Sequence, residues 1–416
     1  MRSLAPLKLP GFNHLAGAYT ANELGNWVGE IALAVLVFDQ TGSPLATAAL
    51  FIGMQFVPGF LGQALVARVE PHGTRRMLPL LYLAEGATFV ALAATADSFA
   101  LWLVVALATV DGTLAIGARA LTRACAAAVL TPNGLLREGN AIINVGFTGA
   151  GAVGPVLAGI AVATLGVQTA LLIDAASFVL VAGVLAAATS LPQVRAHPER
   201  WWARLREGFS YVADRPVLRR LMTMQAAAFV FFSLVLPIEI VYAKETLDAG
   251  DSGYGALLSA WGVGMVLGSL VFFAGGRIQM GVLLFFSTLA VAISYLGMSA
   301  AGTLAVACAA AALGGAGNGV QWVAVMSTVQ GLTDERFQAR VAGLLESIAV
   351  AMPGIGFVLG GVITEFLDAR AGFAVAGFGV LTVLLVAVPL LRGADWSGGG
   401  AAGEGAAGEA VEPLNV

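Results

Sequence analysis

The sequence GAGAVGPVLAG at residues 149–159 lies within an apolar run, 139–165, that contains no charged side chain. A run of this length can cross a bilayer as a helix, which takes about 20 residues. Glycines along such a helix allow neighbouring helices to approach closely, and proline permits local bending. A second stretch of this kind, MPGIGFVLGGV, occupies residues 352–362, and Gly154 and Gly356 stand 202 residues apart. The two stretches predict a membrane protein whose chain is internally duplicated.

The same run also satisfies the dinucleotide-binding pattern G-x-G-x-x-G, and Asp174 follows at a spacing close to the one that the pattern requires. We reject a nucleotide site, because the pattern needs a preceding strand and a soluble βαβ unit around it. Here the glycines lie inside an apolar run, and Pro155 follows them directly. The sequence therefore predicts no nucleotide cofactor.

The chain as a whole is too apolar for a soluble protein. Of its 416 residues, 58% are hydrophobic and 11% are charged (21 basic and 25 acidic), and the mean hydropathy is +0.87. Soluble domains carry about 25% charged residues, which their surfaces need as polar cover. The composition therefore excludes a soluble enzyme, and a net charge of −4 without a basic domain excludes a nucleic-acid binder. Two distant cysteines and three isolated histidines predict neither a disulfide scaffold nor a metal site.

Charged or Gly/Pro-bearing breaks divide the apolar sequence into twelve runs. We therefore predict an all-α membrane protein with twelve transmembrane helices. The expected spans are 14–38, 45–67, 77–96, 99–121, 139–165, 168–190, 219–242, 253–275, 280–299, 303–329, 341–365 and 371–391. The weakest of the breaks is the one between 165 and 168.

The positions of the 21 lysines and arginines predict how these helices are oriented. With both termini on one side of the membrane, 19 of them fall on that side, and only Lys244 and Arg370 fall on the other. Cytoplasmic loops of membrane proteins carry the excess of basic residues. We therefore predict a multi-pass protein of the cytoplasmic membrane with both termini in the cytoplasm.

The duplication predicts two six-helix halves, 1–190 and 219–392, which is the parallel-repeat plan of one major transporter class. The linker between them, 191–218, carries apolar residues at helical spacing with arginines between them. This pattern fits an amphipathic helix on the anionic cytoplasmic leaflet and fits an ordinary solvated connector helix equally well. The tail, 393–416, is rich in Gly, Ala and Glu, and we predict that it is disordered.

Polar side chains inside the apolar runs are the candidate functional residues, because a charge at membrane depth costs at least about 2.5–3.5 kcal/mol on insertion scales. Glu23, Asn26 and Glu30 are spaced i, i+3, i+7 and therefore share one face of the first helix. The further candidates in three other helices are Asp111, Glu239, Asn318 and Gln321. Burial favours the neutral form of a carboxyl group, so the acids among them are candidates for carrying protons.

Several of these acids also have a structural interpretation. Asp111 is near enough in sequence to pair with Arg119, and Glu239 is near enough to pair with Lys244 at the outer rim. Three further acids in the apolar runs are expected to have structural roles, namely Glu85, Asp174 and Glu346.

The pattern Gly149-x-x-x-x-Gly154-Pro155-x-x-x-Gly159 in the fifth helix resembles the antiporter signature of the drug-exporting branch of the major facilitator superfamily. Four other stretches resemble its subgroup of macrolide-efflux and siderophore exporters, namely Asn26-Trp27, Thr41-Gly42-Ser43-Pro44-Leu45, Asp174-Ala175-Ala176-Ser177-Phe178 and Ala339-Arg340-Val341. The resemblance covers about residues 12–392. It implies a fold in which helices one, four, seven and ten line a central cavity.

Two departures from the family pattern bear on mechanism. The loop after the second helix keeps Arg68, Arg75 and Arg76, which the resemblance implies are gating residues, but Ala67 stands where an aspartate is expected. Ala108 stands where the fourth helix of proton-coupled exporters often carries an arginine. Export is therefore better supported by the sequence than proton coupling.

The resulting hypothesis is a secondary active transporter that exports a small lipophilic or amphipathic compound, such as a drug, an antibiotic or a siderophore-like metabolite. It would use the proton gradient, need no cofactor, lie in the bilayer as a monomer and bind no nucleic acid. The alternatives that stay open are an uncoupled facilitator or an importer of the same fold, and a membrane scaffold or sensor that does not transport. An ATP-driven pump is excluded, because the chain has no Gly-x-x-x-x-Gly-Lys-Ser/Thr loop.

Overall fold

The computed structural model describes residues 4–69, 72–188, 190–193, 201–274, 279–334 and 337–391, and these ranges contain helices and no strand. Twelve long helical segments follow one another through these ranges. They are α1 (Phe12–Thr41), α2–η2–α3 (Pro44–Phe51, Ile52–Phe56 and Val57–Val69), α4 (Thr74–Ala94), α5 (Leu101–Leu130), α6 (Leu136–Leu165), α7 (Val167–Ala187), α9–α10–η5 (Pro216–Leu234, Leu236–Val241 and Tyr242–Thr246), α11 (Gly250–Ala274), α12 (Met280–Ala300), α13 (Leu304–Gly331), α14 (Gln338–Phe366) and α15 (Ala369–Leu391). Each predicted span corresponds to one of these segments, which confirms the predicted fold class.

Eleven of the segments are long and apolar enough to cross a membrane. The remaining one, α1, has 30 residues and carries the polar stripe of Glu23, Asn26 and Glu30. The largest boundary error concerns α5, which we expected to end at 121 and which continues to Leu130. Arg119 and Arg123 ended the apolar run in the sequence, but a helix needs continuous backbone hydrogen bonds, not continuous apolar side chains.

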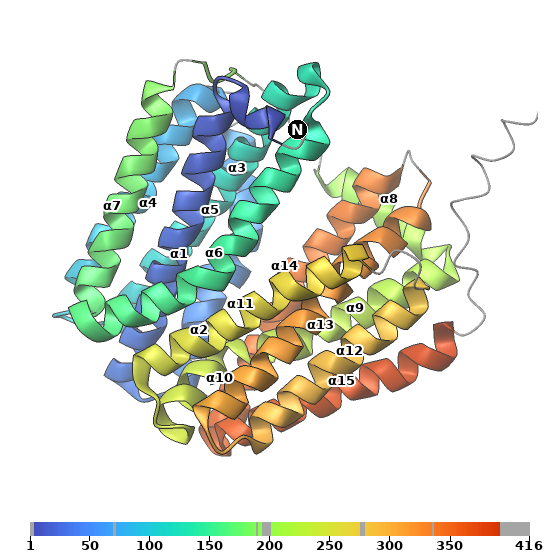
Figure 1. Ribbon diagram of the computed structural model, residues 1–416. Coiled ribbons are helices and arrows are strands. Elements are labelled where there is room, and N and C mark those ends of the chain that lie inside the picture. The colour runs from blue at the N-terminus through green and yellow to red at the C-terminus, as the bar shows by residue number, and fades with distance from the viewer. Residues whose placement is uncertain are drawn as a thin grey trace, which may run out of the picture.

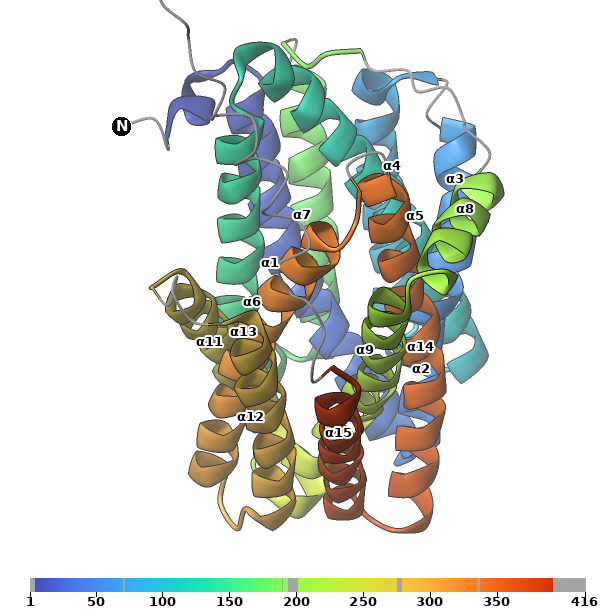
Figure 2. The ribbon, with the colours of Figure 1, turned by 90° about the vertical axis from the view of Figure 1, so that its right-hand side faces the viewer.

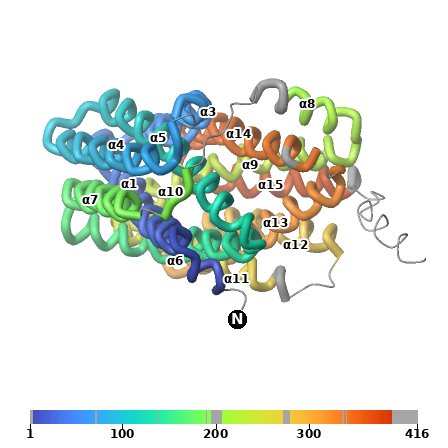
Figure 3. The backbone as a smooth tube through the Cα atoms, turned by 90° about the horizontal axis from the view of Figure 1, so that it is seen from above, coloured from blue at the N-terminus to red at the C-terminus, as the bar shows by residue number. Residues whose placement is uncertain are grey.

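The helices pack into two bundles, which we call the N-terminal and the C-terminal half. In the N-terminal half α1 packs against α6 and α7, and α4 packs against α5 and α7. In the C-terminal half α13 packs against α11 and α12, and α15 packs against α9 and α12. Figure 1 shows the two bundles as separate groups of helices, Figure 2 views them with the C-terminal bundle in front, and Figure 3 shows them side by side.

The largest contacts between the halves are α6 with α11 and α2 with α14, and α10 also contacts α1 and α2. We call the face of the molecule at which α1 begins and α15 ends the terminal face, and the opposite face the distal face. In Figure 1 the terminal-face ends of the N-terminal half lie at the top and those of the C-terminal half lie at the right, so the halves diverge toward the terminal face. They remain together at the distal face.

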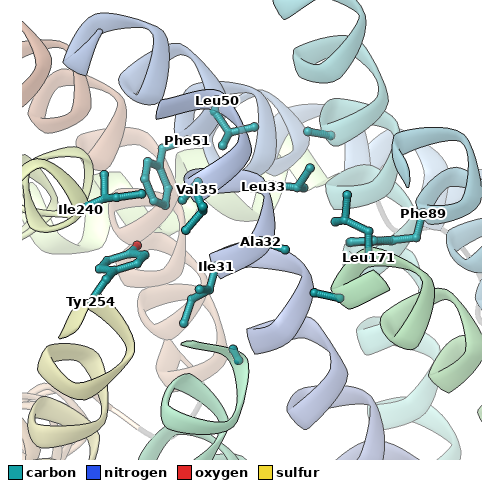
Figure 4. Packing of buried hydrophobic residues seen from close by; sticks show 14 of the residues in the cluster. Ile31, Ala32, Leu33, Val35, Leu50, Phe51, Phe89, Leu171, Ile240 and Tyr254 are labelled. Atoms are coloured by element: carbon teal, nitrogen blue, oxygen red, sulfur yellow. The ribbon is translucent and has the colours of Figure 1, made fainter. Parts of the chain in front are cut away.

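The distal contact is a continuous apolar core. Residues 31–38 of α1 are all buried, and so are residues 237–243 of α10 and η5. A helix that is buried around its whole circumference must be enclosed by neighbours on every side. Figure 4 shows how this happens, with Phe51 of α2 between Val35 of α1 and Ile240 of α10. Both halves therefore close around the distal parts of α1 and α10.

Polar contacts at the distal face reinforce this core. The ammonium group of Lys244, in η5, lies 2.5 Å from Oδ1 of Asp39 at the end of α1 and 2.7 Å from Oδ1 of Asp251 in α11. Ser43 Oγ donates a hydrogen bond to Oε2 of Glu365, near the end of α14, at 2.9 Å. These contacts connect the first two helices of the N-terminal half to the C-terminal half. The described conformation is therefore closed at the distal face.

The linker contains α8 (Trp201–Ala213), which packs against α14 and α9. Tyr211 and Val212 are buried in a small apolar cluster with α14, and Oε2 of Glu207 lies 2.9 Å from Nε of Arg340. Phe209 on the other side of the helix is 65% exposed. An amphipathic helix is thus present in the linker, docked on the terminal-face end of α14. Residues 194–200 of the linker and the whole predicted tail lie outside the described ranges.

Candidate functional site

Polar side chains run along α1 at the depth where the halves separate. Asn22 and Glu23 are buried, and Asn26 and Glu30 are half-buried. Oε1 of Glu23 lies 3.6 Å from Nε of Arg119 on α5, and the Glu23 side chain is 4% exposed while that of Arg119 is 45% exposed. An exposed arginine well inside a membrane helix does not face lipid tails, because a lipid-facing charge is too costly. The ion pair therefore faces the space between the two halves.

Glu30 lies further along α1, where α1 meets the other half. Its Oε1 accepts a hydrogen bond from Nε2 of Gln55, in the π-helical turn η2, at 3.3 Å. Glu239 of α10 is 8% exposed and is the acid of the C-terminal half that interacts electrostatically with Glu30. Tyr254 of α11, which is also buried, interacts with both acids. The structure thus brings Glu30 and Glu239, from opposite halves, to one place.

Asp111 lies on α5, nearer the distal face than Arg119. Its Oδ1 atom is buried, and within the described ranges it has no hydrogen-bond partner. Arg119 exerts an electrostatic influence on Asp111, but its ion pair is with Glu23. The pairing of Asp111 with Arg119 that sequence proximity favoured is therefore not the one formed. Likewise, Lys244 pairs with acids at the distal rim and not with Glu239.

The two candidates on α13 lie apart from these acids. Asn318 is half-buried, and Gln321 donates a hydrogen bond from Nε2 to Oγ1 of Thr288, on α12, at 2.9 Å. Gln321 and Thr288 line a cavity of about 490 Å³ between α9, α12, α13 and α15. Gln225 of α9, which is 8% exposed, also lines it. Gln321 therefore points into the C-terminal half, away from Glu23 and Glu30.

The antiporter-type motif forms the crossing of α6 with α11. Pro155 cannot donate a backbone hydrogen bond, which leaves the Gly151 carbonyl without its usual helical partner. That carbonyl faces Gly262 of α11, and a Cβ atom there would lie 2.2 Å from the oxygen. The next amide, Val156 N–H, donates a hydrogen bond to Oγ of Ser259 at 2.8 Å. The motif thus shapes a contact between backbones from opposite halves.

The motif's glycines differ in their surroundings. Gly154 packs against Trp27 of α1, and Gly159 lies against the backbone of Gly255. Gly149 is exposed, with open space where a side chain would be. Three of the four motif residues, including Pro155, therefore contribute to packing between α6 and its neighbours.

We expect Gly262→Val to destabilise the protein, because a branched side chain cannot fit against the Gly151 carbonyl. Overpacking of this kind costs about 1–3 kcal/mol. Thermal unfolding of the purified protein would measure the effect. Gly183→Val in α7, where nothing lies within 4 Å of the added Cβ, is the matched control. Equal melting temperatures for the two variants would contradict the close contact.

Arg68, Arg75 and Arg76 lie at the connection between α3 and α4 on the terminal face. All three are exposed, and Nη1 of Arg68 donates a weak hydrogen bond of 3.5 Å to the carbonyl oxygen of Ala64 in the same helix. In the described part of the chain none of the three forms an ion pair with an acid. This arrangement agrees with the loss of the expected aspartate at Ala67.

Sequence reasoning missed several residues of this site. It counted Arg119 among the basic residues of one membrane face, whereas Arg119 neutralises Glu23 inside the helix bundle. It did not single out Gln55 or Tyr254. Gln55 and Tyr254 are polar side chains in otherwise apolar runs, and this was the signal available in the sequence. Such residues are also common in membrane helices that have no functional site.

The arrangement can bind and release protons. Within the described ranges no three His, Cys, Asp or Glu side chains are placed to hold a metal ion. Arginine stays charged in proteins, so a change of charge in this arrangement would occur on carboxyl groups such as those of Glu30, Asp111 and Glu239. They come from both halves and lie at the depth where a rearrangement of the halves would alter their surroundings.

Two six-helix bundles joined at one face, with ionisable side chains between them, define a membrane transporter of the major facilitator superfamily. A family model described as transmembrane secretion effector matches residues 1–395, and the chain belongs to this family.

Solved structures with the same fold share little sequence with the chain. The nucleoside transporter NupG aligns with a TM-score of 0.72 at 11% identity, over 92% of this chain and 99% of that one. A peptide transporter of the POT family aligns with a TM-score of 0.75 at 14% identity, over 92% and 94%. A bacterial homolog of the human lysosomal transporter Spinster, in an inward-facing and occupied conformation, aligns with a TM-score of 0.67 at 13% identity, over 92% and 96%. No curated protein matches the chain by sequence.

Proposed function

We propose that the protein is a proton-coupled exporter of a small lipophilic or amphipathic compound and works by alternating access as a monomer in the cytoplasmic membrane. The terminal face, where α1 begins and α15 ends, is the cytoplasmic side. In this proposal the described conformation is open to the cytoplasm, and the substrate enters between the halves from that side. Protons then enter from the distal side and are released into the cytoplasm.

The observation that carries the proposal is the imbalance of charge around Arg119. Arg119, which pairs with Glu23, also acts electrostatically on Glu30 and Asp111, and Glu30 acts in turn on Glu239 of the other half. Buried charges without partners are expensive, so the remaining acids hold protons whenever water is excluded from them. A transporter that must bind and release protons as it changes conformation needs this kind of arrangement.

The export direction is supported by two further observations. The description of the family, transmembrane secretion effector, names secretion across the membrane. Pro155 and Gly159, from the motif that resembles the antiporter signature, lie at the crossing of α6 with α11 where the halves meet. The excess of basic residues on the terminal face supports its cytoplasmic location.

A susceptibility panel tests the export function. A strain that lacks the gene is compared with the same strain carrying the wild-type gene, on drugs, antibiotics and siderophores. We expect the strain with the gene to tolerate higher concentrations of at least one lipophilic or amphipathic compound. Equal tolerance of the whole panel by both strains would contradict the proposal.

The compound with the largest difference then serves as the probe for proton coupling. In inside-out vesicles we expect uphill uptake to stop on addition of a protonophore and in a variant with Glu23→Gln, Glu30→Gln and Asp111→Asn together. Neutral side chains of nearly the same shape remove the proton-binding groups without opening a cavity. Glu346→Gln, at an exposed acid of α14, is the control that should transport normally.

An uncoupled facilitator is the second candidate, and it is favoured by the alanines at 67 and 108 where the family pattern has charged residues. It would move the same probe down its gradient in both directions. Protonophore-insensitive transport that never becomes uphill would select this alternative.

A further inference from the structure

Three acids on three helices of the N-terminal half act on one another electrostatically. Glu85 of α4 and Asp174 of α7 are 0% exposed, and Asp111 of α5 is half-buried with an inaccessible Oδ1 atom. Both Asp111 and Asp174 act electrostatically on Glu85, and Asp111 also acts on Asp174. We call Glu85, Asp111 and Asp174 the carboxyl triad. Two of its members were expected from the sequence to be structural.

The oxygens of the carboxyl triad are short of partners. Within the described ranges, both carboxyl oxygens of Glu85, Oδ2 of Asp174 and Oδ1 of Asp111 are buried without a hydrogen bond. The one hydrogen bond at Asp174 comes from Oγ of Ser177, which lies 3.1 Å from its Oδ1. An ionised carboxylate buried in this way is strongly unfavourable, whereas a protonated one carries no charge to be compensated.

Charge compensation from the surroundings is too small for three anions. The packed helices carry further charged or titratable groups, which include Tyr19, Glu30 and Asp39 of α1, Tyr82 of α4 and Arg123 of α5. The groups that act electrostatically on the carboxyl triad from outside it are Glu23 of α1 and Arg119 of α5. Arg119 is the only cation among them, and its ion pair is with Glu23. At most one of these acids is therefore matched by a positive charge.

The packing of Asp174 shows that the carboxyl triad is separate from the polar stripe of α1. A Cβ atom at Gly29 would lie 2.2 Å from Oδ2 of Asp174, and one at Gly25 would lie 2.5 Å from Oδ1. These glycines are on a different face of α1 from Glu23 and Glu30. The carboxyl group of Asp174 thus lies directly against bare backbone of α1, on the side away from the ion pair.

We infer that Glu85, Asp111 and Asp174 form a proton-binding site inside the N-terminal half, with Asp111 as the member that exchanges protons with the space between the halves. Each proton bound forms one O–H bond on a carboxylate oxygen and removes one negative charge. Within the described ranges no three acidic, His or Cys side chains are placed to hold a metal ion, so the proposed ligand is the proton. It adds proton binding by α4 and α7 to the proposed transport function and does not depend on the direction of transport.

Infrared difference spectroscopy of the purified full-length protein in lipid nanodiscs tests this inference between about pH 5 and about pH 9. The wild-type protein should show the carbonyl band of protonated carboxyl groups. In Glu85→Gln and in Asp174→Asn this band should be weaker than in the wild type by the intensity of about one group. Glu346→Gln should leave this band unchanged. A band of equal intensity in the wild type and both triad variants would overturn the inference.

Thermal unfolding supplies a second readout that a purely structural role would not produce. If the folded protein keeps these protons to higher pH than the unfolded chain, wild-type stability decreases as the pH rises. The stability of the Glu85→Gln variant should decrease less over the same pH range, because its neutral amide has no proton to lose. If the stability difference between Glu85→Gln and the wild type is the same at every pH, Glu85 has only a packing or ion-pair role. Neither readout requires transport, so an uncoupled protein with a proton-binding triad would contradict the proposed function and leave this inference standing.

Discussion

Arg119→Gln is expected to abolish uphill transport and to lower the melting temperature of the protein. The substitution leaves the Glu23 side chain, which is 4% exposed, without its positive partner. Loss of one member of a buried ion pair costs about 3–5 kcal/mol, and the 45% exposure of Arg119 places the expected loss toward the lower end. Uphill transport should be lost, because in the proposed mechanism the Glu23 carboxyl group needs its positive partner.

A double-mutant cycle separates charge from packing at this pair. Glu23→Gln combined with Arg119→Gln should recover most of the lost stability, because no unpaired charge remains in the double variant. It should not recover uphill transport, because Glu23 can no longer exchange a proton. Arg119→Lys keeps the charge and should retain most of the stability. If the double variant is as unstable as the sum of the single variants, the 3.6 Å contact is not an energetically important ion pair.

Lys244→Met is expected to shift the protein toward a conformation open at the distal face. Lys244 bonds to Asp39 of the N-terminal half and to Asp251 of its own half, and its side chain is 19% exposed. Hydrogen bonds to charged groups contribute about 1.5–3 kcal/mol each, less where a partner such as Asp39 is 45% exposed. Removing the contact between the halves should therefore increase the open population by about tenfold.

Distances between spin labels at Ser98→Cys and Gly302→Cys would measure this shift. Both positions are exposed at the distal face, one in each half, and Cys125 and Cys308 are first replaced by serine. Arg370→Gln is the control. It removes a second basic residue at the distal face, whose Nη1 bonds to the Ser299 carbonyl within the same half. An identical distance distribution in Lys244→Met and wild type would show that this ion pair does not hold the halves together.

The helices and their order were predictable from the sequence because apolar run length is a local property. Even the weakest predicted break, between 165 and 168, is a real chain reversal, since Gly166 has a φ of +81° and separates α6 from α7. The end of α5 was not predictable in the same way. Arg119 interrupts the apolar pattern, but its charge is neutralised by Glu23 of α1, which is far away in the sequence.

The pairing of charges could not be predicted because it depends on which helices become neighbours. Sequence proximity suggested Lys244 as the partner of Glu239, yet Lys244 bonds to Asp39, 205 residues away in the chain. The polar stripe of α1 was predicted correctly as a set of residues on one helix, since periodicity defines a face. What lies against that face is set by tertiary packing, which places Arg119 beside Glu23 and Glu239 near Glu30.

Proton binding by Glu30 and Glu239 is expected to control which face of the transporter is open, and the same spin-label pair tests this without a substrate. Glu30 and Glu239 lie on opposite halves, so their mutual repulsion when both are ionised favours separation at the distal face. The wild-type protein should therefore favour the closed distal distance at acidic pH and the open one at alkaline pH, and Glu30→Gln with Glu239→Gln should remove this dependence. Distance distributions that do not change with pH in the wild-type protein would contradict the account.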